Sequence, residues 1–126
     1  MSKEPAFKKY VGFRHLIAAA GYSWGGWKRA LKESAFRQEL AALIAGIALF
    51  LGIGATIQEM LTFLVLMLVL FAIEAINTAV EEIVDRVSPE VSDVGKNAKD
   101  LGSFAVACLL IANGLFVAYV VFEKLF

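Results

Sequence analysis

The sequence has little of the chemistry that builds disulfide frameworks, metal clusters or charge-driven nucleic-acid sites. It contains one cysteine, Cys108, and one histidine, His15, in 126 residues. A single cysteine excludes a disulfide framework within the chain and a multi-cysteine metal site. Twelve Lys and Arg balance twelve Asp and Glu, so the formal net charge is zero. A partner that binds through surplus positive charge, such as a nucleic acid, is therefore not expected.

Charge is also absent from three long stretches, residues 40–58, 60–73 and 101–122. The chain is 60% hydrophobic, whereas soluble domains have about 45–50% apolar residues, and a chain of 13.7 kDa has too small an interior to bury that surface. A helix that crosses a membrane needs about 20 apolar residues, and the second stretch reaches that length only if Glu74 lies inside the membrane. We therefore predict an all-α integral membrane protein, a single domain over 1–126, with transmembrane helices at about 38–57, 60–84 and 101–125.

The orientation follows from the positions of Lys and Arg. Eight of them lie in the first 39 residues, three lie between residues 86 and 99, and none lies between the first two predicted spans. Because cytoplasmic segments carry the excess of Lys and Arg, the N-terminus and the 86–100 loop are predicted to be cytoplasmic.

The segment before the first span predicts an amphipathic helix over about 5–34. Apolar residues recur there at helical spacing: Ile17, Ala20, Trp24, Trp27 and Leu31. Such a helix suits the inner membrane interface, either as a simple anchor or as part of a site. Gly21 and the pair Gly25–Gly26 weaken it, so we expect a bend or break there.

The second predicted span carries a row of acids at its inner end, within EAINTAVEEIVDR (74–86). Glu74, Glu81 and Asp85 fall within about 40° of one another on a helical wheel, and Glu82 is on the next face. An acid in hydrocarbon costs several kcal/mol unless it is paired or protonated. Glu74 is therefore either a buried contact between helices or a proton acceptor for a group that arrives from the bilayer.

The loop KNAKDLGS (96–103) provides positive charge beside this row. Lys96 and Lys99 act either as orientation signals or as a phosphate-binding pair, and Asp100 is predicted at the start of the third span, where it would cap the helix. Glu81 could hold a divalent cation together with phosphate oxygens. These parts suit phosphoryl transfer to a membrane-borne hydroxyl. No GxxxxGK[ST] loop and no HRD or DFG motif is present, which excludes the P-loop and protein-kinase solutions.

Four segments taken together, AAGYSW (19–24), ESAFRQE (33–39), EAINTAVEEIVDR (74–86) and AKDLGS (98–103), resemble the prokaryotic diacylglycerol kinase family over residues 13–122. The resemblance implies a homotrimer with active sites shared between subunits. It also implies a bacterial inner-membrane enzyme that uses MgATP to convert diacylglycerol to phosphatidic acid.

The resemblance further implies residue roles. Glu74 would be the general base with Asn77 in support, and Glu33 and Glu81 would bind Mg²⁺. The implied nucleotide contacts are Arg14, Tyr22, Glu33, Glu81, Glu90, Val91, Ser92, Lys99 and Asp100. The implied lipid contacts are Ala19, Ala20, Gly21, Tyr22, Ser23, Trp24, Ala35, Phe36, Arg37, Gln38, Glu39, Glu74 and Ser103. The family has an arginine in the surface helix; counting back from GYSW gives His15, and we assign its role to the preceding Arg14.

Two alternatives remain open from the sequence. The lipid acceptor could be a polyprenol such as undecaprenol rather than diacylglycerol, although GYSW and AFRQE look more like the diacylglycerol kinase branch. A small proton-coupled transporter with Glu74 as its proton site is the alternative from another class. That function would place the key acid near the membrane midplane, whereas here the acids extend to the cytoplasmic edge.

Overall fold

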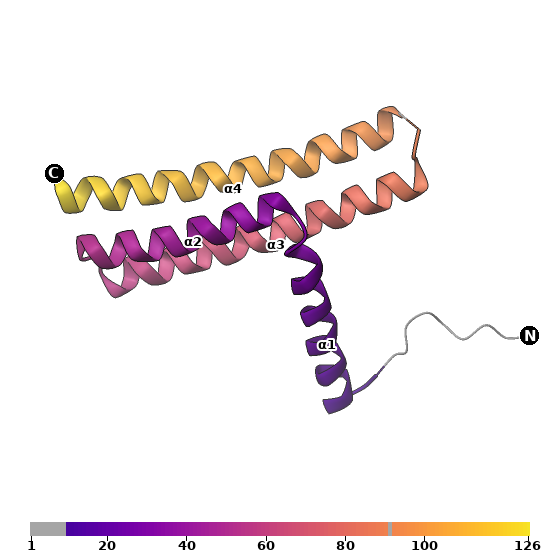
Figure 1. Ribbon diagram of the computed structural model, residues 1–126, viewed down its shortest axis with the longest axis horizontal. Helices are drawn as coiled ribbons and strands as arrows, with labels where there is room; N and C mark the ends of the chain where they lie inside the picture. Colours follow the sequence, from indigo (N-terminus) through magenta and orange to yellow (C-terminus); the bar gives the residue numbers. More distant parts are fainter. Residues whose placement is uncertain (1–9, 91) are drawn as a thin grey trace, which may run out of the picture.

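The structure is a computed structural model that describes residues 10–90 and 92–126. Within those ranges it is all-helical, without strands. The helices are α1 (Phe13–Ala30), α2 (Ser34–Ile53), α3 (Ile57–Val87) and α4 (Asp93–Leu125), arranged as three roughly parallel rods with α1 projecting from them (Figure 1). Residues 5–9 of the predicted surface helix lie outside the described residues.

Three of these helices, α2, α3 and α4, are long and apolar enough to cross a membrane. This confirms the prediction of an all-helical fold with three candidate spans. The helix bounds differ from those expected from charge. Helix α4 begins at Asp93, with the Ser92 hydroxyl accepting a hydrogen bond from the Gly95 amide at 3.1 Å. The prediction that Asp100 caps this helix was therefore wrong, because Asp100 lies two turns inside it.

The turn between α2 and α3 is set by local chemistry rather than by hydropathy. Helix α2 ends at Ile53 because Gly54 adopts a left-handed conformation with φ of 74°, which favours glycine. Thr56 and Glu59 then form a reciprocal capping box at the start of α3, with hydrogen bonds of 2.8 and 3.1 Å. Residues 54–57, all expected within the first span, are therefore a turn and the start of α3.

The apolar core lies where α2, α3 and α4 meet. Its buried members are Phe50, Phe63, Met67, Leu70, Val106 and Val120. Helices α2 and α3 approach closely at Gly46, where an added Cβ would overlap the ring of Phe63. That ring packs against Phe50 with centroids 5.0 Å apart. This close contact requires glycine at position 46.

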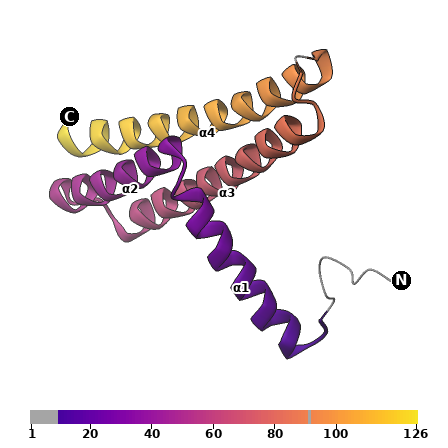
Figure 2. The same cartoon turned by 45° about the vertical axis from the view of Figure 1, so that its right-hand side comes forward.

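Helix α1 is continuous from Phe13 to Ala30, so it has no break at its glycines. Glycine costs about 1 kcal/mol relative to alanine in a helix, which weakens a helix of this length without interrupting its backbone hydrogen bonds. No residue of α1 is buried, and the helix leaves the bundle at a steep angle (Figure 2).

Helices α3 and α4 are much longer than α2. At 1.5 Å per residue, their 31 and 33 residues give lengths of about 46 and 50 Å, against about 30 Å for the 20 residues of α2. The α3–α4 hairpin therefore extends beyond the first residues of α2 (Figure 1). Charged residues gather where α1, α2 and this extension meet, and this region holds the candidate site.

Candidate active site

Two buried carboxyl groups from different helices face each other near the start of α2. Glu39 on α2 and Glu74 on α3 are each only 6% exposed, and their side chains interact directly. The described residues provide no ion-pair partner to either, and Glu39 Oε2 is buried without a hydrogen-bond partner. A buried carboxylate without a cation partner lowers the stability of the fold, so its presence here favours a functional role.

The next turn of α3 joins an amide to a third carboxylate. The Asn77 amide nitrogen donates a hydrogen bond to Glu81 Oε1 at 3.3 Å. Asn77 is 8% exposed and lies against Gly102 of α4, where an added Cβ would overlap the Asn77 side-chain oxygen. Gly102 therefore leaves the space that the Asn77 amide occupies.

A single arginine links α1 to both neighbouring elements. The Arg29 guanidinium donates from Nη1 to Glu33 Oε1 at 2.8 Å and from Nε to Glu82 Oε1 at 2.6 Å. Hydrogen bonds to Glu33 and then to Glu82 raise the pKa of Arg29 above its usual value, so the group remains cationic. This three-residue contact fixes the end of α1 beside α3.

The donor set near Glu74 suits a divalent cation that brings phosphate ligands with it. Glu33 and Glu81 both lie close enough to Glu74 for their negative charges to repel its carboxylate. Across residues 10–90 and 92–126, no three His, Cys, Asp or Glu side chains converge to hold a metal ion by themselves. Mg²⁺ is commonly held by one or two carboxylates plus substrate phosphates, which is what Glu33 and Glu81 could offer.

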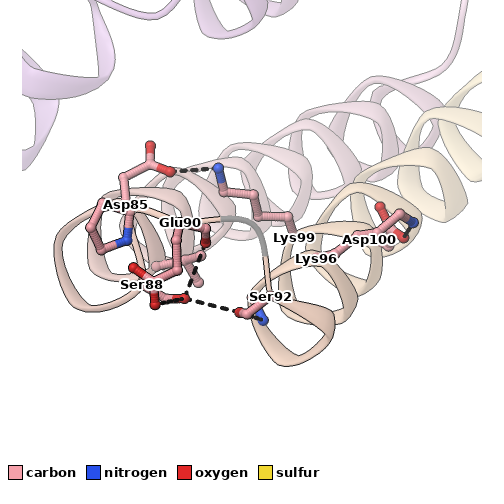
Figure 3. Close-up of a pocket in the computed structure, with 10 residues that line it drawn as sticks. Asp85, Ser88, Glu90, Ser92, Lys96, Lys99 and Asp100 are labelled. Atoms are coloured by element: carbon pink, nitrogen blue, oxygen red, sulfur yellow. Dashed lines mark hydrogen bonds and ion pairs between the residues drawn. The ribbon is translucent and has the colours of Figure 1, made fainter.

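A pocket of about 230 Å³ lies in the α3–α4 turn (Figure 3). Lys99 reaches across from α4 to donate to Asp85 of α3 at 2.5 Å, and Lys96 pairs with Asp100 along α4 at 2.5 Å. These pairs are solvent-exposed, so their ammonium groups remain accessible to an anion. The pocket thus combines two lysines with three acids, Asp85, Glu90 and Asp100, at the end of the hairpin.

The polar wall of this pocket is built by the turn itself. The Ser88 hydroxyl lies 2.9 Å from the Ser92 hydroxyl and 3.3 Å from Glu90 Oε1. Four of the predicted nucleotide contacts therefore line one pocket: Glu90, Ser92, Lys99 and Asp100. Val91, predicted with them, lies outside the described residues.

The remaining predicted contacts are divided between two other places. Arg14, Gly21 and Tyr22 line a separate groove of about 520 Å³ on α1, so one chain does not bring them to the Lys99 pocket. The other predicted lipid contacts on this helix, Ala19, Ala20, Ser23 and Trp24, also lie on α1.

The predicted contacts at the start of α2 differ in exposure. Phe36 is buried between Trp27 and Phe71, with ring centroids 5.7 and 5.1 Å away, so it supports the junction of α1, α2 and α3. Ala35, Arg37 and Gln38 are exposed, and so is Ser103 on α4.

Sequence reasoning missed the Arg29–Glu82 contact. These residues are 53 positions apart, and nothing in their local patterns links them. The offset of Glu82 from the Glu74–Glu81–Asp85 row is the one relevant signal, since it directs Glu82 toward a different neighbour.

These features define a class: a small all-helical protein with three candidate membrane spans, buried carboxyl groups on α2 and α3, and a basic turn between α3 and α4. The model of the family described as prokaryotic diacylglycerol kinase matches residues 21–122. The chain is 58% identical over 114 residues to a diacylglycerol kinase of Sinorhizobium sp, covering 90% of this chain and 83% of that one. It is 39% identical over 104 residues to the diacylglycerol kinase of Escherichia coli K12, covering 80% and 84%. For the diacylglycerol kinase of Haemophilus influenzae the identity is 38% over 110 residues, with 85% and 92% covered.

The chain therefore belongs to the prokaryotic diacylglycerol kinase family. Its class of chemistry is that of a phosphotransferase acting on an alcohol group, with ATP as co-substrate.

Proposed function

We propose that this protein phosphorylates diacylglycerol to phosphatidic acid with MgATP at the cytoplasmic face of a bacterial inner membrane. The observation that carries the proposal is the buried Glu74 carboxyl, which has no cation partner among the described residues and lies on α3, the helix that leads into the basic turn. The named relatives are all diacylglycerol kinases, which favours this lipid over a polyprenol. Membership of a kinase family favours the enzyme over a transporter.

The depth of Glu74 matches the position of a lipid hydroxyl. Glu74 lies seventeen positions after Ile57, which is about 25 Å along the helix. In a hydrocarbon core of about 30 Å, a span that begins at Ile57 places Glu74 just inside the inner boundary. The glycerol hydroxyl of a diacylglycerol lies at that boundary, so it can reach this carboxyl without leaving the lipid.

In the proposed mechanism Glu74 accepts the hydroxyl proton as the lipid oxygen attacks the γ-phosphorus, the bond from that phosphorus to the bridging oxygen breaks, and ADP leaves. Asn77 holds the Glu81 carboxylate in place through its hydrogen bond. Glu33 and Glu81 would hold Mg²⁺, which neutralises phosphate charge when bound. Lys99 would stabilise the phosphoryl oxygens from the pocket at the hairpin end. Positioning and charge account for the chemistry, without a phosphoenzyme.

We assign the remaining predicted nucleotide and lipid contacts on α1 to a site completed by a neighbouring subunit of a homotrimer. This assignment is supported by the separation of the Arg14–Tyr22 groove from the Lys99 pocket within one chain. An apolar groove of about 580 Å³ between α2 and α4 also favours assembly, because small residues line it: Ala42, Ala45, Gly46, Gly114 and Ala118. Such residues allow helices to approach closely in membranes. Helix α1 would then lie in the inner interface, with its exposed Trp24 and Ile17 toward lipid.

The decisive experiment measures ATP consumption by the purified protein in mixed micelles, with diacylglycerol and undecaprenol compared side by side. We expect turnover that depends on diacylglycerol and yields radiolabelled phosphatidic acid from γ-labelled ATP. Turnover with undecaprenol but not with diacylglycerol would show that the lipid acceptor is a polyprenol. No phosphoryl transfer to either lipid would overturn the proposed function.

A further inference from the structure

Helix α1 is held to the bundle by very few side chains near the proposed metal ligands. It buries no residue of its own and runs away from the other helices (Figure 2). The contacts at its end include the edge of Trp27 against Phe36, the Arg29 guanidinium between Glu33 and Glu82, and a hydrogen bond from Arg37 to the Leu31 carbonyl at 2.8 Å. Of these, the Arg29 contact is the one that reaches carboxylates, so it fixes Glu33 and Glu82 relative to α1.

Glu33 lies in the short link between α1 and α2, and among the described residues Arg29 is the one polar partner of its carboxylate. It is the N-cap residue of α2, yet its side chain makes no capping hydrogen bond. Its carboxylate instead accepts from Arg29 Nη1. Because the Glu33 carboxylate does not cap α2, its position is set by its hydrogen bond to Arg29.

Glu82 provides the fixed point for this arrangement. It is on a continuous turn of α3, next to Glu81 in sequence but on the adjoining face. The Arg29 guanidinium contacts Glu82 Oε1 through Nε and Nη2 and contacts Glu33 Oε1 through Nη1. The guanidinium is planar and its donors point in fixed directions, so binding Glu82 on one side fixes where the Glu33 carboxylate is held on the other. A lysine ammonium has no such fixed geometry.

We propose that Arg29 is a positioning residue that, anchored on Glu82, holds the Glu33 carboxylate beside Glu81 and Glu74 for a divalent cation. The inference rests on the proposed function, in which Glu33 and Glu81 are the metal ligands. Arg29 also removes one unit of negative charge from the cluster, so a purely electrostatic role would weaken cation binding. The positioning role predicts the opposite effect, and the two can be separated by experiment.

The test is Mn²⁺ binding to the full-length protein in detergent with the non-hydrolysable analogue AMP-PNP, followed by electron paramagnetic resonance. Residues that orient metal ligands typically change metal affinity by about 10-fold or more when replaced. We expect Arg29→Gln to weaken Mn²⁺ binding by about that factor. Glu82→Gln should weaken it in the same direction, and the double variant should add little to either single change. Lys32→Gln is the matched control, because it removes a nearby positive charge that makes no ion pair among the described residues.

Steady-state kinetics supply a second readout. Arg29→Gln should raise the Mg²⁺ concentration needed for half-maximal rate, with a smaller change at saturating Mg²⁺. Arg29→Lys keeps the charge without the planar guanidinium and should recover only part of the affinity, which keeps the test valid if the glutamine variant folds poorly.

Three results would overturn the inference: tighter Mn²⁺ binding by Arg29→Gln, unchanged binding by Glu82→Gln, or full recovery by Arg29→Lys. Failure of the proposed function would appear separately, as a wild-type protein that transfers no phosphoryl group to lipid.

Discussion

The Asn77 amide nitrogen donates to Glu81 Oε1 one turn further along α3, at 3.3 Å. The opposite end of the same amide lies against Gly102 of α4. Helix α4 thus limits how the Asn77 side chain can turn, and Asn77 in turn restrains Glu81. The proposed metal ligand therefore depends on a glycine of another helix that bears no functional group.

Replacing Gly102 with alanine should reduce activity more than stability. The added methyl group would overlap the Asn77 amide, and overpacking of this kind costs about 1–3 kcal/mol. Displacing Asn77 would also release Glu81, so we expect a higher Mg²⁺ requirement. The measurements are thermal unfolding and lipid-dependent turnover. Gly52→Ala, whose Cβ meets no atom within 4 Å, is the control; equal effects from both substitutions would contradict the interpretation.

Glu74→Gln should leave folding intact and remove most of the phosphoryl transfer. Glutamine keeps the size of the side chain but cannot accept a proton, and loss of a general base typically costs at least about 100-fold in rate. The checks are turnover at saturating diacylglycerol and MgATP, and an unchanged elution volume of the detergent-solubilised protein. A variant with near-normal turnover would remove Glu74 from the mechanism.

The two lysines of the turn should differ in importance, although both form exposed ion pairs. Lys99 bridges α4 to Asp85 on α3 (Figure 3), whereas Lys96 pairs with Asp100 within α4. Exposed pairs contribute little to stability, so neither Lys99→Gln nor Lys96→Gln should change the unfolding temperature much. We expect Lys99→Gln to raise the KM for ATP and Lys96→Gln to have a smaller effect. The reverse order would assign the phosphate contact to Lys96.

The membrane orientation can be tested with single cysteines in a Cys108→Ala background. Gln58 lies at the start of α3 and Asp93 at the start of α4, and both are exposed. If the hairpin end is cytoplasmic, a membrane-impermeant maleimide added to intact cells should label Gln58→Cys and spare Asp93→Cys. Labelling of Asp93→Cys before lysis would reverse the proposed topology.

The spans were predictable from charge because hydrocarbon excludes ionised groups over a fixed thickness. Where the helices end was less predictable, since hydropathy does not register backbone conformation. Gly54 and Thr56 end α2 and start α3 within a stretch, residues 40–58, that carries no charge. At the other end α4 begins at Asp93, well before its apolar stretch. Hydropathy could not predict this start, because the polar first turns of a helix give no hydropathy signal.

The acid row of α3 could be derived from helical periodicity alone, since Glu74 and Glu81 are close in sequence. The partners on other helices could not. Glu39 faces Glu74, and Arg29 reaches Glu82, only through the packing of α1 and α2 on α3. Such contacts depend on tertiary placement, which a single sequence does not specify.

The inequality of helix lengths has a consequence for the choice of membrane. Helix α2 matches a typical bilayer with no surplus, while its first turns carry Glu39 and adjoin Glu33. A thicker bilayer would draw those acids toward hydrocarbon unless α2 changed tilt, and a thinner one would expose the apolar end near Ile53 to water. Hydrophobic mismatch of this kind costs fractions of a kcal/mol per ångström. Acyl-chain length in the surrounding lipid should therefore tune the enzyme independently of the lipid it phosphorylates.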